Sequence, residues 1–172
     1  MRRRRSSWNR TKLRAVKLLA LDVDGVLTDG KVTYGRDGEE LKTFSFQDIM
    51  GLSLARKRGL RIALVSGEKS RALERLAAKL HIEEVCQSCK DKLSAVEAIR
   101  RKRAISLQET CYIGDDVNDL SVLRKVGVAV VPPNAVSQLL AEMVHVTQAS
   151  GGNGAVREVV DLILEAHEVR LR

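Results

Sequence analysis

Short apolar runs alternate with longer amphipathic stretches along most of this 172-residue chain. The runs are Val16–Leu21, Leu60–Val65, Glu84–Cys86, Thr110–Ile113 and Val128–Val131, with a weaker one at Met143–Val146. Between them apolar residues recur at helical spacing, at about Asp48–Lys57, Ser70–Leu80, Lys92–Arg103, Val117–Lys125, Ala135–Ala141 and Ala155–Ala166. Such alternation is typical of a parallel sheet covered by helices. We therefore predict an α/β fold, a Rossmann-like doubly wound parallel sheet flanked by helices.

One segment departs from this alternation. Lys31–Tyr34 and Glu40–Phe46 flank the sequence Gly-Arg-Asp-Gly at 35–38, which predicts a β-hairpin with a tight turn. Ligands of doubly wound sheets bind beyond the carboxyl ends of the strands. Because the hairpin directly follows the first predicted strand, we expect it to project beside the ligand site.

The net charge of +8 originates at the start of the chain. Residues 1–17 contain eight Lys and Arg residues and no acid, and the remaining 22 basic and 22 acidic residues balance. We expect residues 1–15 to be a basic, disordered leader and residues 16–172 to form a single domain. Arg2–Arg5 could contact RNA or anionic lipid, but a solvated tail is the simpler interpretation, so nucleic acid is not an expected partner.

No apolar run approaches the length that spans a bilayer, and the leader lacks the apolar stretch of a secretory signal. We therefore expect a cytoplasmic protein. Cys86 and Cys89 form a C-x-x-C pattern, which a redox pair or half of a zinc site would also show. Ordinary buried thiols explain these two cysteines and Cys111 more simply.

Polar residues follow four of the predicted strands. They are Asp22 and Asp24 after the first, Ser66 and Gly67 after the second, Lys92 after the third, and Asp115, Asp116 and Asp119 after the fourth. Each motif alone has a structural alternative, such as a turn, a helix cap or a solvated helix residue. Because the carboxyl ends of parallel strands meet at one edge of the sheet, their coincidence predicts a functional site there.

The chemistry of this predicted site follows from its charges. Two carboxylates about 4 Å apart repel by about 4 kcal/mol at an effective dielectric constant near 20, so the site requires a cation. Hard oxygen ligands and phosphate binding favour Mg²⁺. Lys92 would add a positive charge, and Ser66 with the following backbone N–H groups would bind phosphoryl oxygens. Asp22 is the candidate nucleophile and Asp24 the candidate acid/base.

Four sequences resemble the motifs of the haloacid dehalogenase superfamily: Leu21-Asp22-Val23-Asp24-Gly25-Val26-Leu27-Thr28, Val65-Ser66-Gly67, Lys92, and Gly114-Asp115-Asp116-Val117-Asn118-Asp119. The resemblance implies Asp22 as nucleophile and Asp24 as acid/base, with Ser66 and Lys92 on the phosphate. It implies Mg²⁺ held by the carboxylates of Asp22 and Asp115 and the carbonyl of Asp24. Asp116 and Asp119 would support these ligands. The second Asp of the first motif separates the phosphatases of this superfamily from its dehalogenases.

The spacing of the motifs leaves no room for a cap domain. The chain from 28 to 60 holds only the hairpin and one helix, and the chain from 67 to 92 holds one helix and one strand. An uncapped site stays open to water, so we expect neighbouring subunits to supply a lid. Over its full length the chain resembles the capless 3-deoxy-manno-octulosonate 8-phosphate phosphatase group, through residues 24–30, 38–42 and 151–158.

The members of that group form tetramers in which hairpins pack together and a C-terminal segment approaches an adjacent site. The resemblance therefore implies a homotetramer with residues 31–46 at the interface. It also makes Arg157 a candidate anion contact, although an arginine on a helix surface would look the same.

Two departures from the group affect the expected substrate. Asn153 stands where the group usually has Arg, and Glu68 follows Ser66-Gly67 where the group typically has Arg. The pattern of Glu68 followed by Lys79 resembles that of the phosphatases of nonulosonate 9-phosphates. A carboxylate near sugar hydroxyls selects a different substrate from a guanidinium, so this pattern bears on the expected sugar. An acid at a helix start is also simply favourable.

We expect a phosphatase of 3-deoxy-D-manno-octulosonate 8-phosphate, a small phosphorylated sugar acid. A nonulosonate 9-phosphate phosphatase is the alternative. From another class, a non-catalytic binding or regulatory module anchored by the basic leader would also retain the fold.

Overall fold

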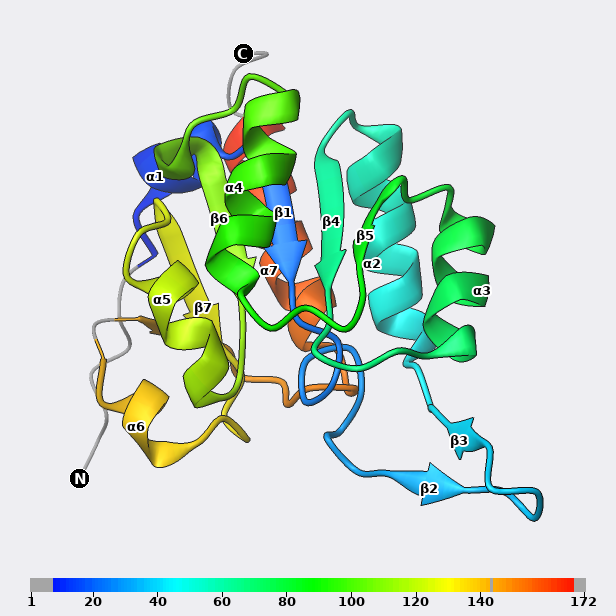
Figure 1. The fold of residues 1–172 in the computed structure, drawn as a ribbon. Coiled ribbons are helices and arrows are strands. Elements are labelled where there is room, and N and C mark those ends of the chain that lie inside the picture. The colour runs from blue at the N-terminus through cyan, green and yellow to red at the C-terminus, as the bar shows by residue number, and fades with distance from the viewer. Residues whose placement is uncertain (1–7, 143, 169–172) are drawn as a thin grey trace.

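The computed structural model describes residues 8–142 and 144–168. Six parallel strands form its main sheet: β1 (Leu18–Leu21), β4 (Arg61–Val65), β5 (Glu84–Cys86), β6 (Thr110–Ile113), β7 (Val128–Val131) and β8 (His145–Val146). Their order in space is β5-β4-β1-β6-β7-β8 (Figure 1). This is the strand order of the Rossmann fold, and the direction of winding reverses between β1 and β6. A ligand crevice is therefore expected at the carboxyl ends of these two strands.

Helices cover both faces of the sheet, as predicted (Figure 1). One layer contains α1 (Arg10–Ala15), α2 (Phe46–Lys57), α3 (Arg71–Leu80) and α7 (Ala155–Glu168), and the other contains α4 (Lys92–Lys102), α5 (Leu120–Leu123) and α6 (Ser137–Leu140). Side chains of a strand alternate between the faces. In β1, Leu19 and Leu21 pack into the first layer and Leu18 and Ala20 into the second, and all four are fully buried. This double burial explains the continuous apolar run.

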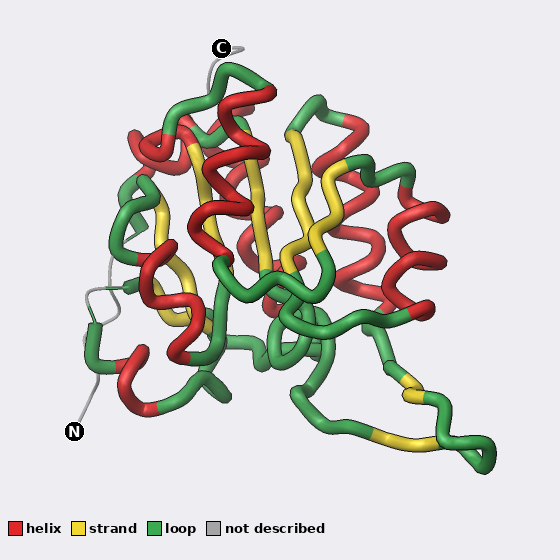
Figure 2. The backbone as a smooth tube through the Cα atoms, viewed as in Figure 1, coloured by secondary structure: helices red, strands yellow, loops and turns green. Residues whose placement is uncertain are grey.

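The predicted hairpin is present and stands apart from the main sheet. β2 (Thr33–Tyr34) pairs antiparallel with β3 (Glu40–Leu41), and the pair extends from the carboxyl edge of the sheet (Figure 2). Both arms are shorter than expected, and Phe46, expected in the second arm, instead begins α2, which the Ser45 side chain caps. Between β1 and β4 the chain forms only this hairpin and α2. Between β4 and α4 it forms only α3 and β5. The expected absence of a cap domain is confirmed.

The region predicted as one helix at 117–125 differs from the expectation. It consists of a 3₁₀ turn, η2 (Val117–Asp119), followed by the short α5. The Asp119 carboxylate turns back to accept backbone N–H groups before the turn, which tightens the start of the segment. A second 3₁₀ turn, η1 (Leu107–Glu109), precedes β6. The weak strand expected at Met143–Val146 is β8, and Met143 itself lies outside the described residues.

The expected boundary between leader and domain at residue 16 is wrong for residues 8–15. Arg10–Ala15 form α1, capped by the Asn9 side chain, and Leu13 is buried in the core. Trp8 stacks on His145 with ring centroids 4.4 Å apart. Two apolar side chains are thus enough to fix a short basic segment on the domain. Arg2–Arg5 lie outside the described residues.

No helix among the described residues has the length and apolar character to cross a membrane.

Candidate active site

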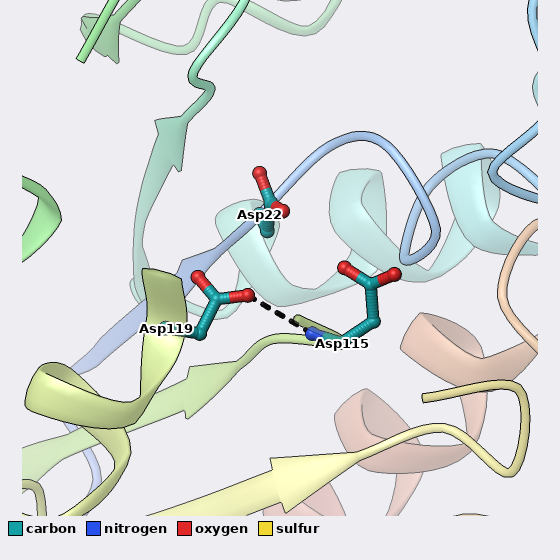
Figure 3. A group of neighbouring side chains, drawn as sticks. All are labelled: Asp22, Asp115 and Asp119. Carbon is teal, nitrogen blue, oxygen red and sulfur yellow. Dashed lines mark hydrogen bonds between the residues drawn. The ribbon is translucent and has the colours of Figure 1, made fainter. Parts of the chain in front are cut away.

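Three carboxylates meet where the winding of the sheet reverses. Asp22 directly follows β1, and Asp115 and Asp119 follow β6. One carboxylate oxygen from each lies within 4.8 Å of the others, and Figure 3 shows the three side chains around a common space. Asp22 and Asp119 are buried and Asp115 is half-buried. The sheet thus brings together the acids that the sequence predicts at its carboxyl edge.

The acids in this cluster disfavour one another's charge. Burial, followed by repulsion from Asp119, raises the pKa of Asp22 to about 6 against the attraction of Lys92. Burial and repulsion from Asp22 and Asp119 raise the pKa of Asp115 to about 8. One oxygen of Asp115, Oδ1, is buried with no hydrogen-bond partner among the described residues. A buried unpartnered carboxylate oxygen beside a second carboxylate is suited to a divalent cation with hard oxygen ligands.

Lys92 supplies the positive charge that holds the cluster together. The Asp91 side chain caps α4, which begins at Lys92 and points this buried side chain inward. Its Nζ lies 2.8 Å from Asp22 Oδ2 and 2.8 Å from Asp119 Oδ1. Burial opposes the charge on the amine, but attraction to the two carboxylates is stronger, and the pKa of Lys92 is raised. Lys92 therefore stays an ammonium ion.

Asp119 uses both oxygens within the protein. Oδ1 accepts hydrogen bonds from Lys92 and, at 2.6 Å, from the Tyr112 hydroxyl. Oδ2 accepts the backbone N–H groups of Asp115 at 3.0 Å and Asp116 at 3.2 Å. A Cβ on Gly114 would lie 2.5 Å from the Asp119 side chain, so only glycine fits there. Asp119 therefore orients the turn that carries Asp115.

The loop after β1 is shaped by its own hydrogen bonds. Thr28 Oγ1 accepts the backbone N–H groups of Gly25 and Gly30, each at 3.2 Å. Gly25 has φ +83°, and a Cβ there would lie 1.9 Å from Asp115 Oδ2. Glycine is thus required both for the backbone conformation and for the close approach of Asp115. Asn134, which follows β7, donates to the Gly25 carbonyl at 2.9 Å and further fixes the loop.

The predicted phosphate-binding residues lie at the neighbouring strand end. Ser66 follows β4, is buried, and its Oγ accepts the backbone N–H of Glu68 at 3.1 Å. Gly67 has open space where a Cβ would lie. The order of the strands places this turn beside the end of β1, which carries Asp22. A phosphoryl group bound beside Asp22 would therefore face the Ser66-Gly67 turn.

Four other predicted site residues have different surroundings. Glu68 is exposed. Lys79 extends over the ring of Phe46, with Nζ 6.0 Å from the centroid. Arg157 Nε donates to both carboxylate oxygens of Asp161, at 2.8 and 2.9 Å, on the surface of α7. Asp116 caps η2. The contacts of Glu68, Lys79 and Arg157 in the described part of the chain do not reach the aspartate cluster.

Two residues of the site were not predicted from the sequence. The Tyr112 hydroxyl binds Asp119, and the position of Tyr112 within an apolar run gave no sign of this contact. Lys42 Nζ lies 2.5 Å from Asp24 Oδ1 and 2.6 Å from Glu40 Oε1. Burial opposes its charge, but the hydrogen bonds to Asp24 and Glu40 prevail, and the pKa of Lys42 is raised. Alternation along an extended segment places residues 40 and 42 on one side, and this spacing could have suggested the Glu40–Lys42 pair but not the contact with Asp24.

A cavity of about 530 Å³ lies between the hairpin and the start of α3. The positive side chains of Lys69, Arg71 and Arg75 line it on the α3 side, and Glu39, Glu40, Leu41 and Lys42 line it on the hairpin side. Lys42 also contacts Asp24, so the cavity lies beside the side chain that pairs with the second Asp of the first motif. It has the size of a small-molecule site, and the three positive side chains on its α3 side suit an anion.

The sequence is similar to those of known hydrolases. A profile of haloacid dehalogenase-like hydrolases matches residues 84–159. The chain is 40% identical over 156 residues to the 3-deoxy-D-manno-octulosonate 8-phosphate phosphatase KdsC of Salmonella typhi, covering 91% of this chain and 83% of the relative.

Solved structures agree with these sequence relatives. The phosphatase of the same name from Yersinia pestis superposes with a TM-score of 0.90 at 36% identity, covering 92% of this chain and 86% of that one. The one from Moraxella catarrhalis, solved with a magnesium ion, a phosphate ion and a KDO molecule, gives 0.88 at 39% identity, covering 92% and 91%. The chain therefore belongs to the haloacid dehalogenase-like hydrolases, in the capless group of 3-deoxy-D-manno-octulosonate 8-phosphate phosphatases.

Proposed function

We propose that the protein is a Mg²⁺-dependent phosphatase that hydrolyses 3-deoxy-D-manno-octulosonate 8-phosphate through an aspartyl phosphate on Asp22. The observation that carries this proposal is that Asp22, Asp115 and Lys92 meet at the point where the direction of winding of the sheet reverses. It combines a nucleophile, a cation site and a fixed ammonium ion in one buried space. The Moraxella relative, bound to magnesium, phosphate and KDO, supports the same ligands here.

The carboxylates of Asp22 and Asp115 and the backbone carbonyl of Asp24 would hold the ion. The unpartnered Oδ1 of Asp115 and the raised pKa values of Asp22 and Asp115 support this assignment, because a bound cation would offset the repulsion. When bound, Mg²⁺ neutralises charge on the phosphoryl oxygens and on the attacking carboxylate.

The side chains of the protein carry out two transfers. In the first, a carboxylate oxygen of Asp22 attacks phosphorus, the ester P–O bond breaks, and Asp24 donates its proton to the departing sugar oxygen. In the second, Asp24 takes a proton from a water molecule that attacks the aspartyl phosphate, and inorganic phosphate leaves Asp22. Lys92, Ser66 and the N–H groups after Ser66 bind the phosphoryl oxygens during both steps.

The cavity beside the cluster supports a sugar acid as substrate. Its volume suits a sugar, and Lys69, Arg71 and Arg75 offer positive charge to a carboxylate. The second candidate substrate is a nonulosonate 9-phosphate, which the exposed Glu68 at the start of α3 favours, together with Lys79. We propose Glu68, Lys79 and Arg157 as residues that influence the choice of substrate, acting between subunits in the assembled enzyme.

We also propose a homotetramer in which the hairpins pack together and neighbouring subunits cover the open site. Support comes from the large apolar side chains that the hairpin and the start of α2 leave exposed, which are Val32, Tyr34, Leu41, Phe46 and Met50. Exposed apolar side chains gathered on one projecting segment are typical of an interface. Three free thiols, at Cys86, Cys89 and Cys111, support a reducing, cytoplasmic location.

A substrate panel tests the function. Purified protein is assayed for phosphate release from octulosonate 8-phosphate, a nonulosonate 9-phosphate and p-nitrophenyl phosphate, with Mg²⁺ and with EDTA, and kcat/KM values are compared. We expect the octulosonate ester to give the highest kcat/KM, EDTA to abolish activity, and Asp22→Asn to be inactive. A higher kcat/KM for the nonulosonate ester would favour the alternative substrate. A wild-type protein as inactive as Asp22→Asn on every ester would favour a non-catalytic binding module.

A further inference from the structure

The hairpin directs one charged side chain into the active site. Side chains alternate along β3 and its continuation, so Glu40 and Lys42 lie on one side and Leu41 on the other. Leu41 is exposed, whereas the Lys42 side chain is only 5% exposed. Its Nζ lies between Asp24 Oδ1 at 2.5 Å and Glu40 Oε1 at 2.6 Å. Lys42, whose side chain is buried at the base of an otherwise exposed hairpin, therefore binds the carboxylate of Asp24, the proposed acid/base.

Asp24 has little else to fix its side chain. The hydrogen bonds that shape its loop involve backbone groups, with Thr28 holding the N–H of Gly25 and Asn134 holding the Gly25 carbonyl. In the part of the chain that the structure describes, Lys42 is the one side chain that hydrogen-bonds the Asp24 carboxylate. A half-buried acid without such a partner would sample several rotamers, and misplacement of a proton donor slows catalysis.

The two buried lysines serve different aspartates. Lys92 contacts Asp22 and Asp119, which belong to the cation and phosphate side of the site. Lys42 contacts Asp24 and also lines the cavity where the leaving group would lie. Glu40 Oε1 also lies 2.6 Å from Lys42 Nζ, and this second negative charge helps to keep the ammonium group in place. Lys92 thus contacts the proposed nucleophile, Asp22, and Lys42 contacts the proposed proton donor, Asp24.

We propose that Lys42 is a positioning residue that holds the Asp24 carboxyl group toward the leaving oxygen, so that the hairpin is part of the proton-transfer machinery. This inference rests on the proposed phosphatase function. In the first step Asp24 gives its proton to the sugar oxygen as the ester P–O bond breaks. In the second step its carboxylate receives a proton from the attacking water. Both steps require the same placement of the Asp24 carboxyl group.

Leaving-group chemistry provides a readout that a merely structural role would not change. p-Nitrophenolate is a stable anion and departs without a proton, whereas a sugar alkoxide requires one. Loss of Asp24 placement should therefore spare the transfer of phosphate from p-nitrophenyl phosphate to Asp22 and slow the subsequent hydrolysis. With a sugar phosphate, both steps should slow.

The experiment compares Lys42→Met with wild type in rapid-mixing kinetics at saturating Mg²⁺. With p-nitrophenyl phosphate we expect a burst of p-nitrophenolate, at a rate within about threefold of wild type, and then turnover slowed about 10- to 100-fold. With octulosonate 8-phosphate we expect no burst, a kcat lowered by a similar factor, and a KM within about threefold of wild type. Lys42→Arg should recover most of the loss, because it restores a cation of similar reach.

Lys31→Met is the matched control, because Lys31 is an exposed lysine at the start of the same hairpin that pairs with Asp29. It should leave both phases unchanged. Thermal unfolding checks each variant, and if Lys42→Met unfolds, Lys42→Arg is compared with Lys42→Gln instead. Equal slowing of both phases, an increase in KM alone, or behaviour like that of Lys31→Met would overturn the role of Lys42. Failure of the wild-type protein to release phosphate from any ester would instead refute the proposed function.

Discussion

The aspartate cluster and the hairpin lie at the same edge of the sheet and are built in opposite ways. In the cluster, Lys92 and Asp119 are almost fully buried, and each has several charged or hydrogen-bonding partners from different strands. In the hairpin, Tyr34 is 69% exposed and the two short strands pair only with each other. Contacts within the subunit thus fix the aspartate cluster, whereas they leave most of the hairpin exposed.

The largest expected effect concerns the buried charge of the aspartate cluster. Lys92→Met would leave Asp22 and Asp119 without their shared ammonium ion, so we expect about 3–5 kcal/mol of destabilisation. Phosphatase activity should be lost as well. The matched control is Lys102→Met on the same helix, whose ion pair with Glu84 is 65% exposed on the lysine side and should contribute at most about 1 kcal/mol. Urea unfolding of the two variants measures the contrast, and equal costs would contradict it.

Glycine offers the same comparison at the level of the backbone. Gly25 in the cluster loop and Gly38 in the hairpin turn both have positive φ, at +83° and +76°. A Cβ at Gly25 would lie 1.9 Å from Asp115 Oδ2, whereas at Gly38 it would meet nothing within 4 Å. We expect Gly38→Ala to cost about 1–2 kcal/mol from the left-handed conformation alone.

Gly25→Ala should cost a further amount of about 1–3 kcal/mol, because Asp115 must move. Chemical denaturation measures both costs, and the affinity for Mg²⁺ provides a second measurement because only Gly25→Ala displaces a proposed ligand. A Gly25→Ala protein that matches Gly38→Ala in both stability and Mg²⁺ affinity would show that the loop is looser than its contacts indicate.

The pH dependence of stability should report on the cluster and not on the hairpin. In metal-free protein the pKa of Asp115 is raised to about 8 and that of Asp22 to about 6. The ordinary Asp pKa in an unfolded chain is about 3.9. The folded protein therefore binds more protons than the unfolded chain between about pH 4 and pH 8. The free energy of unfolding should consequently fall as the pH rises through this window.

Mg²⁺ should reverse this loss. At 100 times its Kd the ion should add about 2.7 kcal/mol to the free energy of unfolding at pH 8. Asp115→Asn should flatten the metal-free pH dependence and remove most of the response to Mg²⁺. Urea unfolding at pH 5 and pH 8, in EDTA and in Mg²⁺, gives the four values required. A metal-free wild-type protein that gains stability between pH 5 and pH 8 would contradict the expected burial of these acids.

The aspartate cluster was largely predictable from the sequence because the path of the chain determines it. Each of Asp22, Ser66 and Asp115 lies directly or almost directly after a strand, and parallel strands end at one edge, so local sequence is enough to bring them together. The Tyr112 contact could not be predicted, because the hydroxyl belongs to a residue that otherwise reads as part of an apolar strand.

Two other misses had a different cause. The Lys42 pair joins residues 18 positions apart across a hairpin whose orientation no local pattern specifies. The incorrect boundary at residue 16 arose because composition averages over a segment. Eight positive charges concealed the apolar side chains of Trp8 and Leu13, whose packing fixes the segment on the domain. Local sequence thus predicted the features that the order of the strands determines, and missed contacts that depend on how separate segments are oriented.

The smallest expected effect on the stability of a single subunit belongs to the hairpin, and it sharpens the comparison most directly. Val32 and Tyr34 are 59% and 69% exposed, so replacing both by Ser should change the free energy of unfolding of a subunit by no more than about 0.5 kcal/mol.

If the hairpins form the interface of a tetramer, the same change should convert the protein to smaller species in light scattering after size-exclusion chromatography. Tyr34→Phe keeps the apolar area and should keep the assembly. Retention of the full assembly by the double variant, or a wild-type protein that is monomeric, would show that the exposed side chains of the hairpin are not an interface between subunits.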